Sequence, residues 1–228
     1  MSPKKRFPPL RRILRLALLA VAAFYGFVLV SLAYLRFFPP LTTMVQVQRR
    51  VESWFTRGDY TKRMTWVDAS LLPRHVPRAI VAAEDTRFWQ HHGFDFESLD
   101  AARRQAERTG LPPRGASTLT QQLVKNLYFT THRSYVRKGL EMTVTPLAEL
   151  VLGKPRILEL YLNVVEWGPG VYGIEAAARY HYRIPARQLG RERTARLAAV
   201  LPAPRRRRPD RMGSYARVIQ QRMAAMGW

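Results

Sequence analysis

The sequence contains no cysteine and few acidic residues. Without cysteine it can form neither a disulfide framework nor a cysteine-ligated metal site, and it is compatible with either redox compartment. Its 16 Asp and Glu residues stand against 38 Lys and Arg residues, a formal net charge of +22. An excess of this size selects anionic partners, such as nucleic acid, anionic lipid or a phosphorylated substrate, and does not determine a fold.

One segment, residues 16–35, contains no charged residue. A helix of that length, rising 1.5 Å per residue, spans about 30 Å, the thickness of the hydrocarbon core. A cleaved signal peptide is the alternative, but its apolar core is usually about 7–15 residues long, and residues 36–40 make a poor cleavage site. We therefore expect a retained transmembrane helix over residues 16–36, after a basic tail over residues 1–15.

The flanking charges predict the orientation of this helix. Six cations precede it and only Arg36 immediately follows it, and cytoplasmic flanks carry the excess of Lys and Arg. We expect a cytoplasmic N-terminus, a single pass through the inner membrane and a body on the periplasmic side. A basic domain in that position would not meet nucleic acid.

A juxtamembrane segment, residues 37–70, follows the apolar run. Its apolar residues recur at the spacing of one helical face: Met44, Val47, Val51, Trp54 and Phe55. Two interpretations stay open, a helix lying on the membrane surface and an ordinary helix packed on its own domain.

Residues 71–228 show no alternating strand pattern and no internal repeat, so we expect one mainly α-helical domain with a cleft. Spacing, caps and Gly/Pro breaks predict helices over about residues 79–89, 134–152, 155–165, 171–182, 186–201 and 215–226. Asp95 and Thr118 are expected to cap two more helices, and Thr118 has capping-box spacing to Gln121. Pro146 predicts a kink or break, and residues 168–170 a turn.

Three segments carry side chains suited to chemistry, and the first is residues 83–95. Glu84, Phe88 and His91 follow an i, i+4, i+7 spacing and would share one helical face. A carboxylate beside aromatic surface can have a raised pKa, which suits a general base. The simpler interpretation is a surface acid beside Arg87. For His91 a structural hydrogen bond is favoured over a metal, since a helical two-histidine spacing is lacking.

The second segment, residues 115–126, predicts a helix with two distinct faces. Its apolar face should be buried: Leu119, Leu123 and Leu127. Its polar face could hold a diphosphate and sugar hydroxyls: Thr118, Gln121, Gln122 and Lys125. The helix start near Ser117 adds backbone donors for an anion. A merely solvated face is the alternative, although it would usually carry more acids and fewer glutamines.

The third segment, residues 137–141, combines cations with one acid. Arg137 and Glu141 lie at i and i+4, Lys138 adds a second cation, and Arg133 lies one turn earlier. The alternative is a surface ion pair that stabilises the helix by about 0.2–0.5 kcal/mol.

In this order the segments resemble the glycosyltransferase domain that polymerises peptidoglycan from a lipid-linked disaccharide. The first matches Glu-Asp-x-x-Phe-x-x-His-x-Gly-x-Asp. The second matches Gly-x-Ser-Thr-x-Thr-Gln-Gln-x-x-Lys-Asn, with Ala116 where the family usually has a second Gly, and the third matches Arg-Lys-x-x-Glu. Residues 154–163 and 173–178 also look like family motifs, so the resemblance covers about residues 70–205. With the chain ending at Trp228, we expect a monofunctional member without a transpeptidase domain.

The resemblance implies a lysozyme-like helical fold and a role for each matching residue. Glu84 resembles the general base, and Glu141 a second acid near the leaving diphosphate. Lys125, Arg133 and Arg137 resemble the cations that hold the diphosphate, and Thr118 and Gln121 would orient the donor. Further substrate contacts are expected from Asp85, Phe88, His91, Ser117, Gln122, Asn126 and Lys138.

The implied reaction lengthens a lipid-diphosphate-linked glycan by transfer to the 4-hydroxyl of lipid II. It forms β-1,4 links with inversion and releases undecaprenyl diphosphate. The resemblance requires no cofactor but leaves room for a divalent cation, Mg²⁺ or Mn²⁺. Expected partners are lipid II, the growing glycan, membrane lipids and other cell-wall synthesis and division proteins.

Two other functions compete with this one. A membrane-anchored muramidase or lytic transglycosylase would also use a Glu in a helical cleft, but the cleavage of neutral glycan has no evident use for the cations Lys125, Arg133 and Arg137. A non-enzymatic scaffold would use its basic face to bind anionic lipid or wall polymer, and would not need Glu84.

Overall fold

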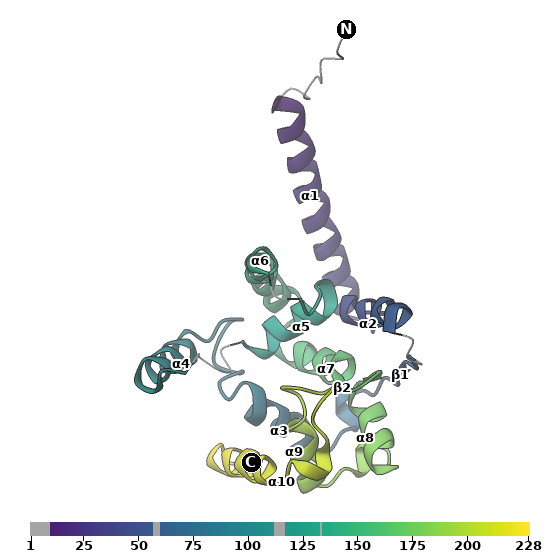
Figure 1. The fold of residues 1–228 in the computed structure, drawn as a ribbon, viewed down its shortest axis with the longest axis vertical. Helices are drawn as coiled ribbons and strands as arrows, with labels where there is room; N and C mark the ends of the chain where they lie inside the picture. The colour runs from purple at the N-terminus through teal and green to yellow at the C-terminus, as the bar shows by residue number, and fades with distance from the viewer. Residues whose placement is uncertain (1–9, 57–59, 112–116, 133) are drawn as a thin grey trace.

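The computed structural model describes residues 10–56, 60–111, 117–132 and 134–228. The described chain is mainly helical, as expected, with one helix projecting from a rounded body (Figure 1). Its α-helices are α1 (Leu10–Leu35), α2 (Met44–Thr56), α3 (His75–Glu84), α4 (Phe96–Thr109), α5 (Leu119–Tyr128), α6 (Tyr135–Leu152), α7 (Lys154–Val164), α8 (Ile174–Tyr182), α9 (Arg191–Ala198) and α10 (Gly213–Ala225). Short 3₁₀ turns join them: η1 (Ala69–Leu71), η2 (Ala186–Gln188) and η3 (Pro209–Arg211).

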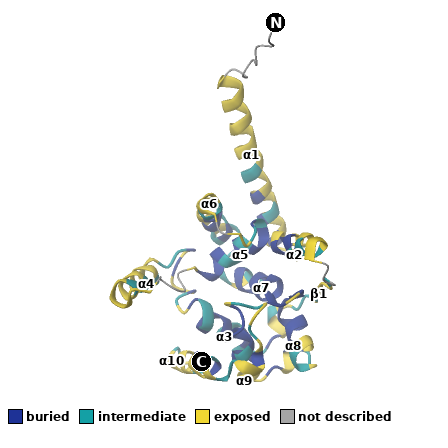
Figure 2. Ribbon diagram, viewed as in Figure 1, coloured by how far each residue is buried: buried dark blue, intermediate teal, exposed yellow. Residues whose placement is uncertain are grey.

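Helix α1 is long and apolar enough to cross a membrane, as predicted. It begins at Leu10, earlier than the expected residue 16, and most of its surface is exposed (Figure 2). Only its last turns enter the body, where Val28, Leu32 and Leu35 are buried, and the Tyr25 hydroxyl donates to Thr143 Oγ1 of α6 at 2.6 Å. The exposed part therefore stands clear of the protein core.

Helix α2 packs on the body through polar side chains. Gln46 and Gln48 are buried, and the Gln48 amide exchanges two hydrogen bonds with Thr131, at 2.9 and 2.7 Å. Val45 is buried with them, whereas the five apolar residues of the predicted face are exposed, Trp54 to 71% and Phe55 to 81%. Helix α2 thus packs on α5 through one face and exposes the predicted apolar face, so the structure is compatible with both interpretations of this helix.

The core of the body lies around α7, in the layer where Figure 2 is mostly dark blue. Ile157, Leu160 and Leu162 of this helix are completely buried, and α5 packs against it. Helices α3, α9 and α10 pack on one another at the end of the body away from α1 (Figure 1). Helix α4 stands at the edge of the body and buries no residue fully.

A small sheet is the main feature that the sequence did not predict. Strands β1 (Arg63–Met64), β2 (Glu166–Gly168) and β3 (Val171–Tyr172) pair in the order β1-β3-β2. The predicted turn joins β2 and β3, and its Gly170 has φ +71° with no room for a Cβ, which would lie 2.5 Å from Thr61 O. Strands this short cannot show an alternating pattern, so none was visible.

Three predicted helices have wrong bounds. The helix expected over residues 171–182 begins at Ile174, because Val171–Tyr172 form β3, and the helix expected over residues 186–201 is divided into η2 and α9. The helix expected over residues 79–89 ends at Glu84, because Asp85 adopts an extended backbone with φ −160° and ψ 77°. The helix predicted over residues 134–152 is confirmed as α6, which runs through Pro146 to Leu152 without the break that this proline suggested. Proline therefore did not terminate this helix, whose remaining turns are stabilised by packing on α1, α5 and α7.

Candidate active site

A cleft of about 980 Å³ opens where α3 ends and α5 begins. Residues of the first two sequence segments line one part of it, among them Glu84, Asp85, Ser117, Thr118, Gln122 and Lys125. The C-terminal part of the chain contributes Arg207, Tyr215 and Arg222. The fold thus brings together groups that lie far apart in the sequence.

Glu84 is the last residue of α3, and its carboxylate lines the cleft. Burial raises its pKa above the usual range for Glu, and the charge of Asp85 adds to the rise. The hydrogen bond from Gln122 and the charges of Lys125 and Arg207 act in the opposite direction. A carboxyl whose pKa is raised by burial is suited to accept a proton near neutral pH.

The amide of Gln122 is held in one orientation between two partners. Tyr161 of α7 donates its hydroxyl proton to Gln122 Oε1 at 2.9 Å. Because Oε1 is occupied, the amide nitrogen is left to donate to Glu84 Oε2, also at 2.9 Å. Tyr161 is completely buried, so this chain of hydrogen bonds ties the carboxylate to the core.

Asp85 connects the end of α3 to the start of α5. Its carboxylate oxygens accept from His91 Nε2 at 3.0 Å, and one also accepts from the backbone N–H of Leu119 at 2.9 Å. The Gly93 N–H donates to His91 Nδ1, which assigns the ring proton to Nε2. These contacts fix the backbone that follows Glu84 against the first turn of α5.

The predicted common face of Glu84, Phe88 and His91 does not exist, because the helix ends at Glu84. Phe88 is completely buried beneath the Nζ of Lys154, which lies 4.3 Å from its ring centroid. His91 is also buried and faces Asp85. Neither side chain lines the cleft, and their substrate contacts stay a prediction.

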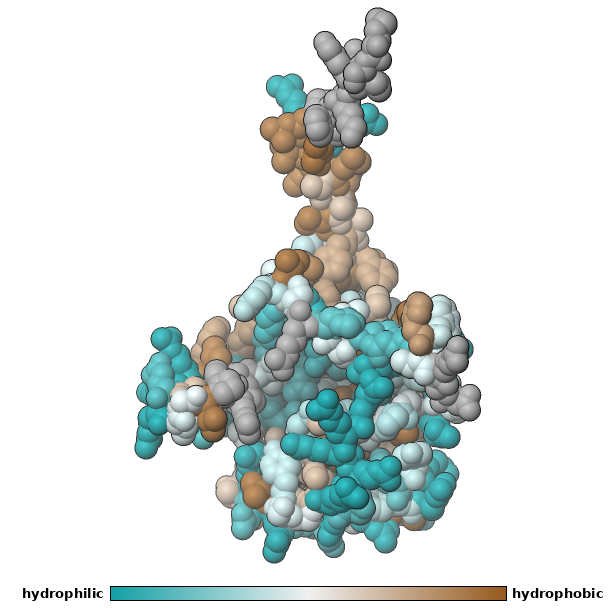
Figure 3. Space-filling view, viewed as in Figure 1, coloured by the Kyte–Doolittle hydropathy of each residue, from teal (hydrophilic) through white to brown (hydrophobic). Residues whose placement is uncertain are grey.

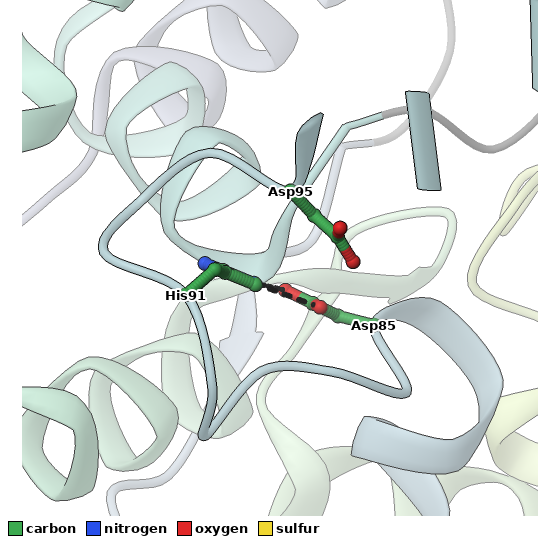
Figure 4. A group of neighbouring side chains, drawn as sticks. All are labelled: Asp85, His91 and Asp95. Carbon is green, nitrogen blue, oxygen red and sulfur yellow. Dashed lines mark hydrogen bonds and ion pairs between the residues drawn. The ribbon is translucent and has the colours of Figure 1, made fainter. Parts of the chain in front are cut away.

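The described residues that lie close enough to hold a metal ion are Asp85, His91 and Asp95, whose ligand atoms lie within 4.8 Å of one another (Figure 4). Each already has partners: His91 binds Asp85, and Asp95 accepts from Ser98 N at 2.9 Å and Ser98 Oγ at 2.6 Å. Mg²⁺ and Mn²⁺ prefer oxygen ligands. The group fits a hydrogen-bond network better than a divalent cation.

Thr118 and Gln121 form the predicted capping box at the start of α5. Thr118 Oγ1 accepts from Gln121 N at 3.2 Å, and Thr118 N donates to Gln121 Oε1 at 3.1 Å. The Thr118 hydroxyl donates a hydrogen bond to Gly93 O at 2.7 Å. Thr118 lines the cleft, whereas Gln121 is buried away from it.

The rest of α5 follows the predicted division into two faces. Leu119, Leu123 and Leu127 are buried, as expected. Asn126 is buried too and donates to Gln122 O at 2.8 Å. Lys125 lines the cleft, and its pKa is lowered by burial and by the charge of Arg137, while Glu84 acts to raise it.

The third segment forms an ion cluster at the start of α6. Glu141 is buried and pairs with Arg137 and with Lys138, whose Nζ lies 3.4 Å from Oε2. Because two cations occupy this carboxylate, it does not fit a divalent cation in the described arrangement. Glu141 does not line the cleft, and Arg133 lies outside the described residues.

Sequence reasoning missed the residues that the C-terminal part contributes. Arg207 belongs to a run of four arginines, and Arg222 and Tyr215 belong to the last helix, where nothing marked them as more than surface residues. Tyr161 lay within a family-like motif but without a role. Their position at the cleft depends on how α9 and α10 pack on α3.

Comparison with known proteins identifies the family of this chain. The family model described as transglycosylase matches residues 50–226. The biosynthetic peptidoglycan transglycosylase of Pseudomonas aeruginosa is 45% identical over 202 residues, which cover 87% of each chain. The protein of the same name from Chromohalobacter salexigens is 42% identical, over 96% of this chain and 94% of its own length. The one from Pseudomonas syringae pv. syringae is 45% identical, over 96% of this chain and 92% of its own length. This chain belongs to the transglycosylase family.

Proposed function

We propose that this chain is a peptidoglycan glycosyltransferase that polymerises glycan from lipid II. Family membership and relatives of this name over most of the chain support the reaction class. The observation that carries the mechanism is a single cleft shared by Glu84, Gln122 and Lys125, in which a carboxyl of raised pKa lies beside an ammonium.

In the proposed reaction Glu84 accepts the proton from the 4-hydroxyl of lipid II. That oxygen attacks the anomeric carbon of the growing chain from the face opposite the leaving group. The bond between that carbon and the diphosphate oxygen breaks, and undecaprenyl diphosphate leaves with the electron pair. The product is a β-1,4 link, formed with inversion.

In this proposal Lys125 is the cation whose charge acts most strongly on the base, ahead of Arg207. A cation placed where negative charge develops stabilises the transition state. Arg137 and Lys138 extend the positive region along α6, while Glu141 holds these two cations in place. Arg133 is assigned to the same diphosphate region by its motif position, and a requirement for Mg²⁺ or Mn²⁺ stays a prediction to be tested with a chelator.

We also propose how the enzyme meets the membrane. Helix α1 is the single-pass anchor, with its basic N-terminal side in the cytoplasm and the catalytic body in the periplasm. The outward face of α2, with Trp54 and Phe55, lies at the lipid surface, because exposed aromatic side chains favour the interface. This placement would keep a lipid-linked substrate near the cleft and leave other cell-wall proteins as candidate partners.

The test is a polymerisation assay with purified protein and labelled lipid II in detergent. We expect Glu84→Gln to lower the rate at least about 100-fold, with lipid II binding largely retained. Glu97→Gln, at an exposed acid of α4 outside the cleft, should behave as the wild type. Near-normal turnover of Glu84→Gln would refute the base assignment.

The same protein should be incubated with finished glycan. Release of soluble muropeptides in place of polymer would favour a muramidase or lytic transglycosylase. No reaction on either substrate by folded protein supplied with divalent metal would favour a scaffold.

A further inference from the structure

A run of arginines crosses the middle of one face of the body, between α9 and η3. Figure 3 shows a dense group of hydrophilic side chains in the middle of this face. We call residues 205–208 the arginine loop. Together with the end of α8 and with α9, this loop borders a second cavity, of about 620 Å³.

This cavity is lined with positive charge. Besides Arg207, its lining includes Arg183, Arg193, Arg196, Arg205, Arg206 and Arg208, with only two carboxylates, Glu192 and Asp210. Glu192 is already bound by Arg196 at 2.9 Å. Among the described residues, Arg206 and Arg208 have no ion-pair partner. The cavity therefore has unused capacity for an anion.

Neutral groups in the cavity wall add hydrogen-bonding capacity. Tyr182 lines the cavity, and its hydroxyl is buried without a partner among the described residues. Arg193 lies over its ring, 5.4 Å from the centroid. Guanidinium groups bind carboxylates through two parallel hydrogen bonds, so several of them around one cavity suit a ligand with several carboxylates.

The cavity and the catalytic cleft are neighbours that share one lining residue, Arg207. This side chain is held in place by a hydrogen bond from Nη1 to Ala199 O at 2.9 Å and by the ring of Tyr215, 5.7 Å away. At the other end of the loop, Arg205 lies 3.7 Å from Glu52 of α2. A chain molecule in the cleft could therefore extend into the cavity along the loop.

We infer that the arginine-lined cavity binds the carboxylates of the peptide stems on the peptidoglycan chain that occupies the cleft. This inference rests on the proposed function and adds a site to it. Peptide carboxylates recur along the polymer, so they match a row of arginines that starts at the cleft. Arg205 at one end of the loop lies near α2, but Arg183, Arg193 and Arg196 belong to the end of α8 and to α9, and α9 lies at the end of the body away from α1 (Figure 1). This position favours the polymer over a lipid headgroup.

The test compares the full-length wild type with Arg206→Gln/Arg208→Gln, since these residues line the cavity and not the cleft. The probe is a fluorescent glycan oligomer with intact peptide stems, measured by anisotropy, beside the same oligomer with amidated stems. The control Arg187→Gln/Arg217→Gln removes two exposed charges that line neither cavity.

We expect the double variant to bind the intact oligomer about tenfold more weakly and the amidated oligomer as the wild type does. The control should bind both normally. Equal affinity of wild type and double variant for the intact oligomer would overturn the inference. Equal binding of the intact and amidated oligomers by the wild type would also overturn it. A double variant that loses affinity only for phosphatidylglycerol vesicles would overturn it as well, and would assign the arginines to lipid binding.

Polymerisation of lipid II is measured in parallel, so that the two proposals fail separately. If the wild type makes glycan but the oligomer results are negative, only the peptide-stem site is refuted. If the wild type makes no glycan, the proposed function itself is refuted.

Discussion

At Glu84, opposing effects act on one carboxyl. Burial favours its protonated form, and the charge of Asp85 does the same, whereas Gln122, Lys125 and Arg207 favour the carboxylate. Burial prevails, and the pKa is raised. A base must be deprotonated to act, so the turnover of this enzyme should fall as the pH drops through that raised pKa.

Replacing Gln122 should shift the acid limb of the pH profile, which is the pH range in which activity falls as Glu84 becomes protonated. Gln122→Leu removes the donor that stabilises the Glu84 carboxylate, so the pKa rises further and the limb shifts to higher pH, by about one unit. The measurement is kcat/KM against pH. The control Gln105→Leu, at an exposed glutamine of α4, should leave the profile unchanged. If the Gln122→Leu profile is also unshifted, the hydrogen bond from Gln122 does not affect the pKa of Glu84.

Lys125 is predicted to act on both binding and rate. Lys125→Ala removes the cleft ammonium nearest the base, so kcat/KM should fall about 100-fold and lipid II should bind more weakly. Lys62→Ala, at an exposed lysine outside the cleft, is the control. A variant that loses only thermal stability would exclude the diphosphate role.

At the scale of elements, the start of α5 organises the site. The capping box of Thr118 and Gln121 fixes the first turn, while Asp85 accepts the Leu119 N–H and so ties that turn to the end of α3. Gln122 and Lys125 lie about one and two turns further along α5. The direction in which their side chains point therefore depends on this cap.

Loss of the cap should destabilise the body. Thr118→Ala removes the acceptor for Gln121 N and the donor to Gly93 O, which should cost about 1–2 kcal/mol of stability. Thr118→Ser keeps both hydrogen bonds and should retain most of the wild-type stability. Urea unfolding of both variants in detergent measures the difference, and equal losses would show that the hydroxyl is not responsible.

Local signals predicted the caps well and the ends of some elements poorly. Asp95 accepts from Ser98 N as an N-cap, and Pro155 lies in the first turn of α7, both as expected. The end of α3 was missed because Asp85 leaves the helix to bind His91 and Leu119. One of these partners lies 34 positions along the chain, beyond the reach of any periodicity.

At the scale of the whole molecule, the positive charge is divided among separate regions. One part belongs to the N-terminal flank of α1, a second to the cleft and α6, and a third to the arginine loop. The net charge of +22 therefore describes several sites and not one uniform surface. Orientation across a membrane would place the first region in a different compartment from the other two.

The absence of cysteine allows a clean test of that orientation. Ser2→Cys and Ser214→Cys each introduce the only thiol, and Ser214 is exposed on α10. In cells with a permeabilised outer membrane, a membrane-impermeant maleimide should label Ser214→Cys, and label Ser2→Cys only after lysis. The reverse pattern would place the body in the cytoplasm.

The sequence by itself determined the apolar helix α1, the mainly helical class, the caps at Asp95 and Thr118, and the placement of Arg137 one helical turn from Glu141. These features depend on neighbours within a few positions, where composition and spacing act directly. Only the tertiary structure decided that α2 turns its apolar face outward, that Tyr161 orients Gln122 toward Glu84, and that Arg207 borders both the cleft and a second cavity. Those arrangements result from packing between distant helices, whose contacts no local pattern encodes.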